Sequence, residues 1–320
     1  MRRTKIVVVT SAGLLDETAE QLSSINPSCE IISVIGEFEE IIRVVSDADA
    51  LINCPRNLFN AEIINKASNL RWIHCGGAGI EEFLIPELVN CPIVLTNGKI
   101  VQGPGVSDHA IGLLLCLTRR LNLVVQGQKV ATDNRPVELR GKNAAVFGIG
   151  GIGTLIVEKL RAFGVLVTGV DVEYVPLSCG MDNVYGPERF EGEIGKFDIL
   201  ICAAPLTKST SKFFDVKLLE KMKKGSYFIN VSRGELVDLD GLIQANVGNR
   251  LGGIGLDVSD PEPLPEDHPL RKMNNVIISP HIAGLSDYNR QRSLVLLQKN
   301  ISRFVKDQQL INVVDKKRGY

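Results

Sequence analysis

The sequence lacks the features that mark several classes of protein. Its 36 basic and 37 acidic residues leave a formal net charge of −1, so no broad positive surface favours a nucleic acid or an anionic membrane. The seven cysteines are odd in number, scattered and never spaced as CxxC, which argues against a disulfide framework and against a zinc site. The longest apolar run, "AIGLLLCL", is far shorter than the ~18 residues of a membrane span. We therefore expect a cytoplasmic protein without a metal, whose partner is a small molecule.

The 320 residues predict two domains, each built on a parallel sheet. Short β-branched runs alternate with segments long enough for a helix, a pattern typical of α/β proteins. Five runs predict a small first domain: Lys5–Thr10, Ile31–Ile35, Asp49–Asn53, Arg71–Cys75 and Pro92–Thr96. Six more predict a larger one: Ala144–Gly148, Leu166–Val170, Asp198–Cys202, Ser226–Val231, Gly253–Val258 and Val276–Pro280. Apolar residues at three- and four-residue steps predict helices over Val106–Leu121 and near the C-terminus.

A glycine-rich loop follows the first strand of the second series. In "GIGGIG", Gly148, Gly150 and Gly153 have the GxGxxG spacing, and "TLIVEKLRAFG" then predicts a helix that ends at Gly164. The second glycine lets the backbone approach a pyrophosphate, and the N-terminus of the helix offers free N–H groups to that anion. A strand, a loop and a helix in this order predict a dinucleotide site. A glycine-rich turn without a ligand is the simpler alternative.

The acidic residues beyond this loop favour one dinucleotide over the other. Asp171 ends the second strand, 18 residues past Gly153, where its carboxylate can accept hydrogen bonds from an adenosine ribose diol. Glu173 adds a second negative charge, and no arginine stands next to Asp171. A 2′-phosphate would be repelled there. The predicted cofactor is therefore NAD or NADH rather than NADP.

Three ionisable residues further along suit the reduction of a carbonyl group. Arg233, Glu262 and His281 each follow a predicted strand, where open α/β sheets place their ligands. A guanidinium can hold a carboxylate and a carbonyl oxygen together, and a carboxylate bonded to an imidazole stabilises the protonated ring that gives a proton to an alkoxide. The simpler alternatives are a surface salt bridge for Arg233 and a solvated loop acid for Glu262. His74, which ends an apolar strand, is instead expected in the core.

Taken together, these motifs resemble the D-isomer-specific 2-hydroxyacid dehydrogenase family over almost the whole chain, including its glyoxylate/hydroxypyruvate reductase-like and phosphoglycerate dehydrogenase-like members. The segment "RWIHCGGAGIEEF" looks like the substrate loop of the family, and "GVSDHAIGLLLCLTRR" looks like its bridging helix, with Asp108 where a glutamate is usual. The other matching motifs follow in the family's order: "GIGGIG", "AAPLTKST" (Ala203–Thr210), "INVSRGELVD" (Ile229–Asp238), "GLDVSDPEPLP" (Gly255–Pro265) and "SPHIAG" (Ser279–Gly284).

The resemblance implies a fold class and a division of the chain. It implies a doubly wound parallel-sheet (Rossmann) NAD-binding domain, residues 101–286, inserted in a smaller flavodoxin-like α/β domain. The smaller domain, residues 1–100 and 287–320, would bind the substrate and close over the cofactor. Relatives are usually dimers through the nucleotide domain, so we expect a homodimer.

The resemblance also implies roles for individual residues. Arg233 would bind the 2-keto oxygen and a carboxylate oxygen of the substrate, and His281 would be the general acid in reduction and the base in oxidation, oriented by Glu262. Asp257 would meet the nicotinamide carboxamide. The loop formed by Gly77, Ala78 and Gly79 would hold the substrate carboxylate, with Arg233 and His281 completing the substrate site. The implied cofactor-binding residues are Gly148, Gly150, Gly151, Ile152, Gly153, Asp171, Ala204, Pro205, Thr207, Val231, Ser232, Asp257, His281, Ala283 and Gly284.

The function predicted from the sequence is an NAD-dependent oxidoreductase that interconverts a small 2-keto acid and its D-2-hydroxy acid. Two alternatives remain open at this point: a formate- or phosphite-type dehydrogenase, and an NADH-sensing scaffold that resembles the transcriptional corepressors related to this family. The substrate is also open, since the segment before the glycine loop lacks the tryptophan that many members carry. Arg56 and Lys99 are extra cations that could meet a second acidic group on a substrate, with solvated loop charges as the simpler alternative.

Overall fold

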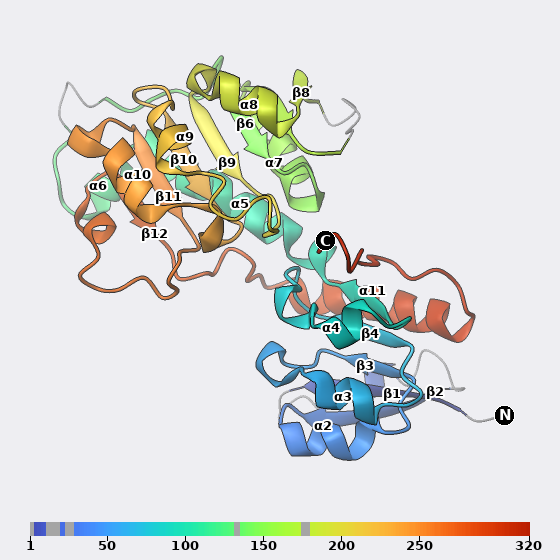
Figure 1. Cartoon of the computed structure of the whole chain (residues 1–320). Helices are drawn as coiled ribbons and strands as arrows, with labels where there is room; N and C mark the ends of the chain where they lie inside the picture. The colour runs from blue at the N-terminus through green and yellow to red at the C-terminus, as the bar shows by residue number, and fades with distance from the viewer. Residues whose placement is uncertain (1–2, 11–19, 23–28, 131–134, 174–179) are drawn as a thin grey trace. The chain divides into compact units, whose positions relative to one another are not determined.

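The computed structural model describes residues 3–10, 20–22, 29–130, 135–173 and 180–320, and these residues form two compact units. Unit 1 consists of Met1–Gln102 and Ser286–Tyr320, and unit 2 consists of Gly103–Leu285. Each unit is built around its own parallel sheet (Figure 1). Cys179 lies outside the described residues, and the other six cysteines are free thiols.

Unit 1 contains a five-stranded parallel sheet in the order β2-β1-β3-β4-β5. Val8 in its first strand pairs with Ser33 on one side and with Ile52 on the other. This strand order is that of flavodoxin-like proteins, and it confirms the fold predicted for the smaller domain. The strands are β1 (Thr4–Thr10), β2 (Cys29–Ile35), β3 (Ala50–Ile52), β4 (Trp72–Cys75) and β5 (Val94–Asn97).

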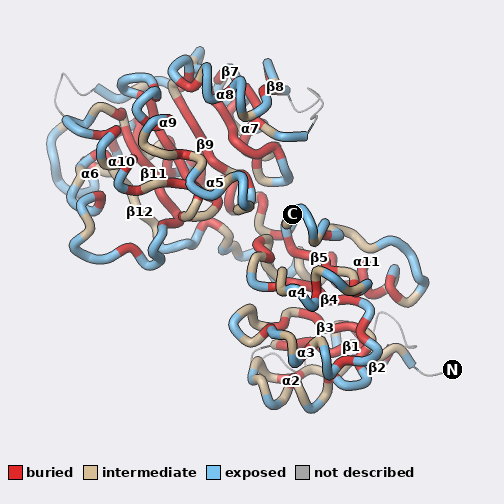
Figure 2. Tube along the Cα trace, in the orientation of Figure 1, coloured by how far each residue is buried: buried red, intermediate tan, exposed pale blue. Residues whose placement is uncertain are grey.

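Helices cover both faces of this sheet and leave its central strands buried (Figure 2). One face packs against α2 (Phe38–Val45), α3 (Ala61–Lys66) and α4 (Pro86–Val89). The other face packs against α11 (Asn289–Val305), where Leu297, Ile301 and Phe304 meet Trp72. The chain enters α3 through a side-chain cap, because Asn60 accepts hydrogen bonds from the first-turn amides of Glu62 and Ile63. Short 3₁₀ turns follow β3 at Arg56–Leu58 and β4 at Glu81–Phe83.

Unit 2 contains a seven-stranded parallel sheet in the order β12-β11-β10-β9-β6-β7-β8. The direction of winding reverses between β6 and β9, as in Rossmann folds, and this confirms the doubly wound sheet predicted from the sequence. The strands are β6 (Asn143–Phe147), β7 (Leu166–Val170), β8 (Asn183–Tyr185), β9 (Ile199–Cys202), β10 (Tyr227–Asn230), β11 (Gly253–Leu256) and β12 (Val276–Ile278).

The prediction of six strands for this sheet was wrong by one, because it missed β8. This strand has three residues, of which Asn183 is exposed and Tyr185 is buried. It lies at the edge and pairs only with β7. An edge strand this short needs no continuous apolar run, so its sequence carries almost no strand signal.

Two helical layers enclose the sheet of unit 2. One face packs against α5 (Lys99–Thr118) and α7 (Gly151–Ala162), and the other packs against α8 (Pro187–Glu193), α9 (Val216–Glu220) and α10 (Leu239–Ala245). A short helix, α6 (Leu121–Val125), follows α5. Further 3₁₀ turns lie at Ile194–Lys196, Gly234–Leu236, Val247–Asn249 and Pro269–Lys272.

Helix α5 is longer at its start than the predicted Val106–Leu121 and ends three residues earlier. The segment "QGPG" resembles a helix breaker, yet Pro104 lies inside the helix. By length and composition this 20-residue helix could cross a membrane, although half of its most apolar window is buried in the protein. Its residues Val106, Leu113 and Leu117 belong to the core against the seven-stranded sheet. Packing on that sheet explains the apolar composition.

Candidate active site

The glycine loop between β6 and α7 combines two tight positions with one open position. Gly148 has a φ of +94°, and a Cβ there would lie 2.5 Å from the Ala204 Cα. A Cβ on Gly153 would lie 1.9 Å from the Gly148 carbonyl oxygen. A Cβ on Gly150 would meet nothing within 4 Å. The loop is therefore closed on its protein side and open beside Gly150, where the N-terminus of α7 begins, and this cradle fits a dinucleotide pyrophosphate.

Asp171 links the end of β7 to this loop. Its carboxylate oxygens accept hydrogen bonds from the Ile149 amide at 2.8 Å and from the Glu173 amide at 3.0 Å. A carboxylate offers about four acceptor positions, so the side chain can still accept hydrogen bonds from ribose hydroxyls. The carboxylate predicted to meet the ribose thus lies beside the loop predicted to hold the phosphates.

The remaining predicted cofactor residues occupy loops at the carboxyl edge of the same sheet. Ala204, Pro205 and Thr207 follow β9, and Val231 and Ser232 follow β10. The hydroxyl of Ser232 donates to the Ala204 carbonyl, which joins these two loops. Residues after neighbouring parallel strands therefore meet around the point where the winding reverses.

Arg233 follows β10 in a loop that is fixed by its neighbours. The side-chain amide of Asn230 donates to the Arg233 carbonyl at 2.9 Å, and the Arg233 guanidinium donates to the Ser232 carbonyl at 2.9 Å. A Cβ on Gly234 would lie 2.1 Å from the carbonyl carbon of Ser259. Gly234 therefore allows the arginine loop to touch the loop that carries Glu262. This role of Gly234 could not be predicted from the sequence, although the residue lies inside the motif "INVSRGELVD".

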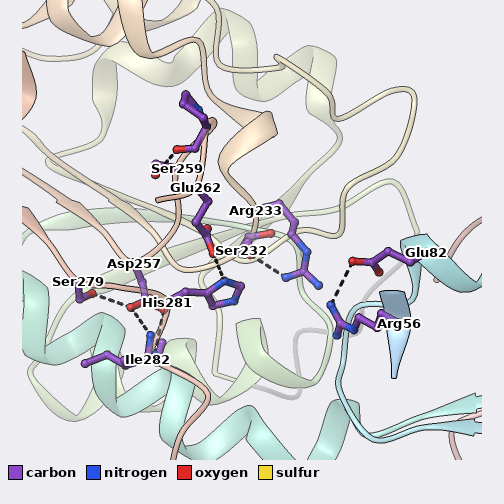
Figure 3. A network of polar contacts seen from close by, with 12 residues as sticks. Arg56, Glu82, Ser232, Arg233, Asp257, Ser259, Glu262, Ser279, His281 and Ile282 are labelled. Carbon is purple, nitrogen blue, oxygen red and sulfur yellow. Dashed lines mark hydrogen bonds and ion pairs between the residues drawn. The ribbon is translucent and has the colours of Figure 1, made fainter. Parts of the chain in front are cut away.

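Glu262 and His281 form the pair that the sequence predicts. The Glu262 Oε1 lies 2.6 Å from the His281 Nδ1, with the two side chains 41% and 47% exposed. An ionised carboxylate only accepts hydrogen bonds, so Nδ1 carries the proton of this bond and Nε2 remains for proton exchange. Figure 3 shows the Arg233 guanidinium and the His281 ring extending into the same region of unit 2. The fold therefore brings the three residues together.

Asp257 fixes the turn that carries the imidazole. Its carboxylate accepts hydrogen bonds from the Ser279 hydroxyl at 2.6 Å and from the amides of Ile282 and Ala283 at 3.0 and 2.9 Å. His109 Nε2 lies 3.3 Å from the same carboxylate. Burial raises the pKa of Asp257, but the hydrogen bonds from His109, Ser279 and the two amides outweigh burial and hold the pKa below its ordinary value.

This network gives Asp257 a structural role that the sequence analysis did not foresee. The side chain is 1% exposed, and the Asp257 carbonyl also accepts from the amide of His281, which has a φ of +53°. The contact predicted between Asp257 and the nicotinamide carboxamide stays a prediction. His109 contributes to the network from α5. No local sequence signal links His109 to Asp257.

The predicted substrate loop lies in unit 1, whereas all the other predicted site residues lie in unit 2. The Ala78 carbonyl accepts from the Asn97 side chain at 2.7 Å, and the Gly79 carbonyl accepts from the Arg56 guanidinium at 3.1 Å. Within the described part of the chain, neither the Ala78 amide nor the Gly79 amide donates a hydrogen bond. Two such N–H groups can receive an anion, so the loop suits a carboxylate.

Comparisons with known proteins agree with this geometry. The family described as D-isomer specific 2-hydroxyacid dehydrogenase, NAD binding domain, matches residues 111–283. A glyoxylate reductase of Thermofilum pendens is 32% identical over 292 residues, which cover 87% of this chain and 84% of that protein. A D-isomer specific 2-hydroxyacid dehydrogenase family protein of Aeromonas salmonicida has a crystal structure that superposes with a TM-score of 0.79, with 25% identity, and the match covers 99% of this chain and 100% of that one.

A third relative was solved with a cofactor. It is the NADPH-dependent glyoxylate/hydroxypyruvate reductase of Sinorhizobium meliloti, in complex with NADP and sulfate. It is 24% identical, with a TM-score of 0.79, over 99% of this chain and 100% of that one. At this identity the similarity shows a shared fold.

Proposed function

On the premise that the chain belongs to the D-isomer-specific 2-hydroxyacid dehydrogenase family, we propose that it interconverts a small 2-keto acid and its D-2-hydroxy acid with NAD(H). The protein is an oxidoreductase that acts on CH–OH groups. The observation that best supports the proposed 2-keto acid reaction is the 2.6 Å hydrogen bond between Glu262 and His281. This pair lies in the same unit as the dinucleotide cradle. A bound nicotinamide dinucleotide supplies the hydride for reduction or accepts it in oxidation.

In the proposed reduction each residue has one task. The guanidinium of Arg233 binds a carboxylate oxygen and the 2-keto oxygen, which polarises the carbonyl. The Nε2 of His281 gives its proton to the oxygen as it becomes an alkoxide, and Glu262 stabilises the protonated ring through Nδ1. The amides of Ala78 and Gly79 hold the substrate carboxylate. In oxidation His281 takes the proton back from the hydroxyl group.

The preference for NAD over NADP is part of the proposal. Asp171 and Glu173 supply negative charge at the end of β7, where a 2′-phosphate would be repelled. The measurement is the ratio of kcat/KM for NADH to that for NADPH, which should exceed ten because about 1.4 kcal/mol of repulsion is enough for a tenfold preference. A homodimer and a cytoplasmic location complete the proposal, both from the family resemblance.

The catalytic assignment is tested by following NADH absorbance with a panel of 2-keto acids for the wild type and two variants. His281→Asn is the sharper variant, because asparagine tolerates the positive φ of this position better than alanine does. Loss of the general acid should lower kcat by about 10²–10⁴. Glu262→Gln should lower kcat less, since the imidazole keeps its place but loses the charge that stabilises its protonated form.

Other outcomes select other functions. Wild-type activity in His281→Asn would remove the acid–base assignment. Oxidation of formate or phosphite, without turnover of any 2-keto acid, would select the alternative dehydrogenase. NADH binding with no turnover at all would select the scaffold.

A further inference from the structure

A cavity of about 410 Å³ lies wholly within unit 1, beside the predicted substrate loop. Its wall includes the loops after β3 and β4 and the first turn of α11. Two arginines, Arg56 and Arg290, line it, and none of the described residues that line it is acidic. Gly77 belongs to both the cavity wall and the substrate loop, so the cavity begins next to the residues whose amides are proposed to hold the substrate carboxylate.

Arg56 is held against the substrate loop by two contacts. One terminal nitrogen of its guanidinium donates to the Gly79 carbonyl at 3.1 Å, and the other lies 3.6 Å from the Glu82 carboxylate (Figure 3). A Cβ on Gly77 would lie 2.5 Å from the first of these nitrogens. The Arg56–Glu82 pair is partly exposed, at 38% and 49%, so solvent weakens its hold on the charge. A guanidinium has five N–H donors, and several remain for an anion.

The rest of the wall combines polar side chains with apolar ones such as Pro55 and Val101. Asn53, Gln102 and Ser293 provide amide and hydroxyl groups, and the Asn53 Oδ1 is buried without a hydrogen-bond partner among the described residues. An alkyl side chain placed against Arg56 and Arg290 would displace water from the guanidinium groups without replacing the hydrogen bonds. A second acidic group would gain charge-assisted hydrogen bonds. Lys99, the other cation singled out in the sequence, does not line the cavity.

We propose that the cavity binds a second anionic group of the substrate, and that the preferred 2-keto acid carries two anionic groups (called a dianion below), of which the distal carboxylate or phosphate is held by Arg56 and Arg290. This inference rests on the proposed function, because it assumes that Ala78 and Gly79 hold the carboxylate next to the keto group. It adds that the chain discriminates by charge, and thus disfavours glyoxylate and uncharged side chains.

The first test compares kcat/KM for 2-oxoglutarate, 3-phosphohydroxypyruvate and 2-oxobutyrate. The wild type should prefer at least one dianion over 2-oxobutyrate by tenfold or more, and the preferred dianion identifies the distal group as carboxylate or phosphate. Arg56→Gln and Arg290→Gln should each lower kcat/KM for that dianion by about ten- to a hundredfold, mainly through KM, since they remove charge-assisted hydrogen bonds. In both variants the ratio of kcat/KM for the dianion to kcat/KM for 2-oxobutyrate should also fall.

A matched control separates this effect from net charge. Arg43→Gln removes the same charge from α2, where the side chain is 73% exposed and does not line the cavity. Arg43→Gln should leave the ratio of kcat/KM for the dianion to that for 2-oxobutyrate unchanged. Because Arg56 also supports the Gly79 carbonyl, Arg290→Gln decides the matter if Arg56→Gln fails to fold. A wild-type ratio in Arg290→Gln would overturn the inference.

Equilibrium binding distinguishes failure of this inference from failure of the proposed reaction. Titration calorimetry with the same three acids, in place of an activity assay, should show dianion binding that both cavity variants weaken and that high salt reduces. Such binding without turnover would support the proposed role of the cavity and contradict the proposed reaction. Turnover of all three acids without a preference, and without an effect of the variants, would keep the reaction and remove the cavity's role.

Discussion

Two glycine-rich loops, one in each unit, both follow a strand of a parallel sheet but have different surroundings. The loop at residues 76–79 follows β4 in unit 1, and the loop at residues 148–153 follows β6 in unit 2; each strand is buried over nearly its whole length. Beside Gly150 the space is open and the 12-residue helix α7 begins. Beside Gly77 the space is filled by the guanidinium of Arg56.

This difference suits the two ways of binding an anion that the proposed function requires. A loop that leads into a long helix offers backbone N–H groups and the positive end of the helix dipole, so it can bind a pyrophosphate without a charged side chain. The loop of unit 1 leads into a 3₁₀ turn of three residues, which supplies little dipole. The positive charge that binds an anion at this loop must therefore come from side chains, and side chains can be changed without altering the fold. Selectivity for the substrate is therefore expected in unit 1, and the cofactor site in unit 2 is expected to be generic.

The largest predicted effect concerns Gly153. In Gly153→Ala the new Cβ would lie 1.9 Å from the backbone oxygen of Gly148, which cannot move without displacing β6 or α7. Overpacking costs about 1–3 kcal/mol, and we expect the upper end of this range because a backbone atom blocks the new Cβ. Urea unfolding should therefore show a lower midpoint, and NADH affinity should be lost with it.

Gly150→Ala is the control for this prediction. Its Cβ would enter open space, so the free energy of unfolding should stay within about 1 kcal/mol of the wild type while NADH binds more weakly. Equal loss of stability in the two variants would show that the loop is not closed on one side and open on the other.

The part of the site that could be predicted from the sequence is the part encoded locally. The glycine loop lies within six residues, and Asp171 follows at a spacing set by one helix and one strand. The shared location of the proposed catalytic trio could be predicted because each member follows a strand of a sheet whose strands are all parallel, so that their ends share one edge. The same regularity made the two sheets predictable, except for the short edge strand β8.

The rest depends on contacts between distant segments, which no local pattern records. Gly234 matters because the backbone at Ser259 approaches it, and His109 matters because it reaches Asp257, 148 residues later. The cavity of unit 1 likewise joins a loop near Arg56 to a helix near residue 290. Packing in three dimensions fixes these pairs, and a single sequence shows only that suitable residues exist.

The second prediction concerns stability at acid pH, where the two units should behave differently. Burial lowers the pKa of His74, on β4 in unit 1, from an ordinary value near 6.5 to about 4. Above pH 6.5 the ring is neutral in both the folded and the unfolded state, so its protonation does not lower the free energy of unfolding. As the pH falls from 6.5 to 4 only the unfolded state binds the proton, so unit 1 should lose about 3 kcal/mol of unfolding free energy. The protein's one tryptophan, Trp72, lies on the same strand and reports this unfolding by fluorescence.

Unit 2 should behave differently over the same range. The pKa of Asp257 is held below its ordinary value of 3.8, so its contribution is present above pH 3.8 and is lost only as the pH falls through the folded-state pKa. Far-ultraviolet dichroism should therefore show that part of the helix content survives when Trp72 fluorescence has changed. In His74→Asn the loss between pH 6.5 and 4 should disappear. Simultaneous unfolding by both probes in the wild type and the variant alike would contradict the assignment to His74.

The smallest predicted effect returns to the two loops. Gly77→Ala places a Cβ 2.5 Å from a terminal nitrogen of Arg56, which is the far end of a flexible side chain. The guanidinium can rotate away, so the free energy of unfolding should change by less than about 1 kcal/mol, in contrast to Gly153→Ala. Because the displaced charge no longer lies at the cavity wall, KM for a dianionic 2-keto acid should rise severalfold.

Gly98→Ala is the matched comparison within unit 1. Its Cβ would lie 2.2 Å from the Gly76 carbonyl oxygen, so it should cost as much stability as Gly153→Ala because a backbone atom blocks it. If Gly77→Ala proved equally costly, Arg56 would be a fixed part of the loop rather than a movable charge beside it. The two loops would then both be rigid backbone sites, and the difference in selectivity would have to arise from Arg290 alone.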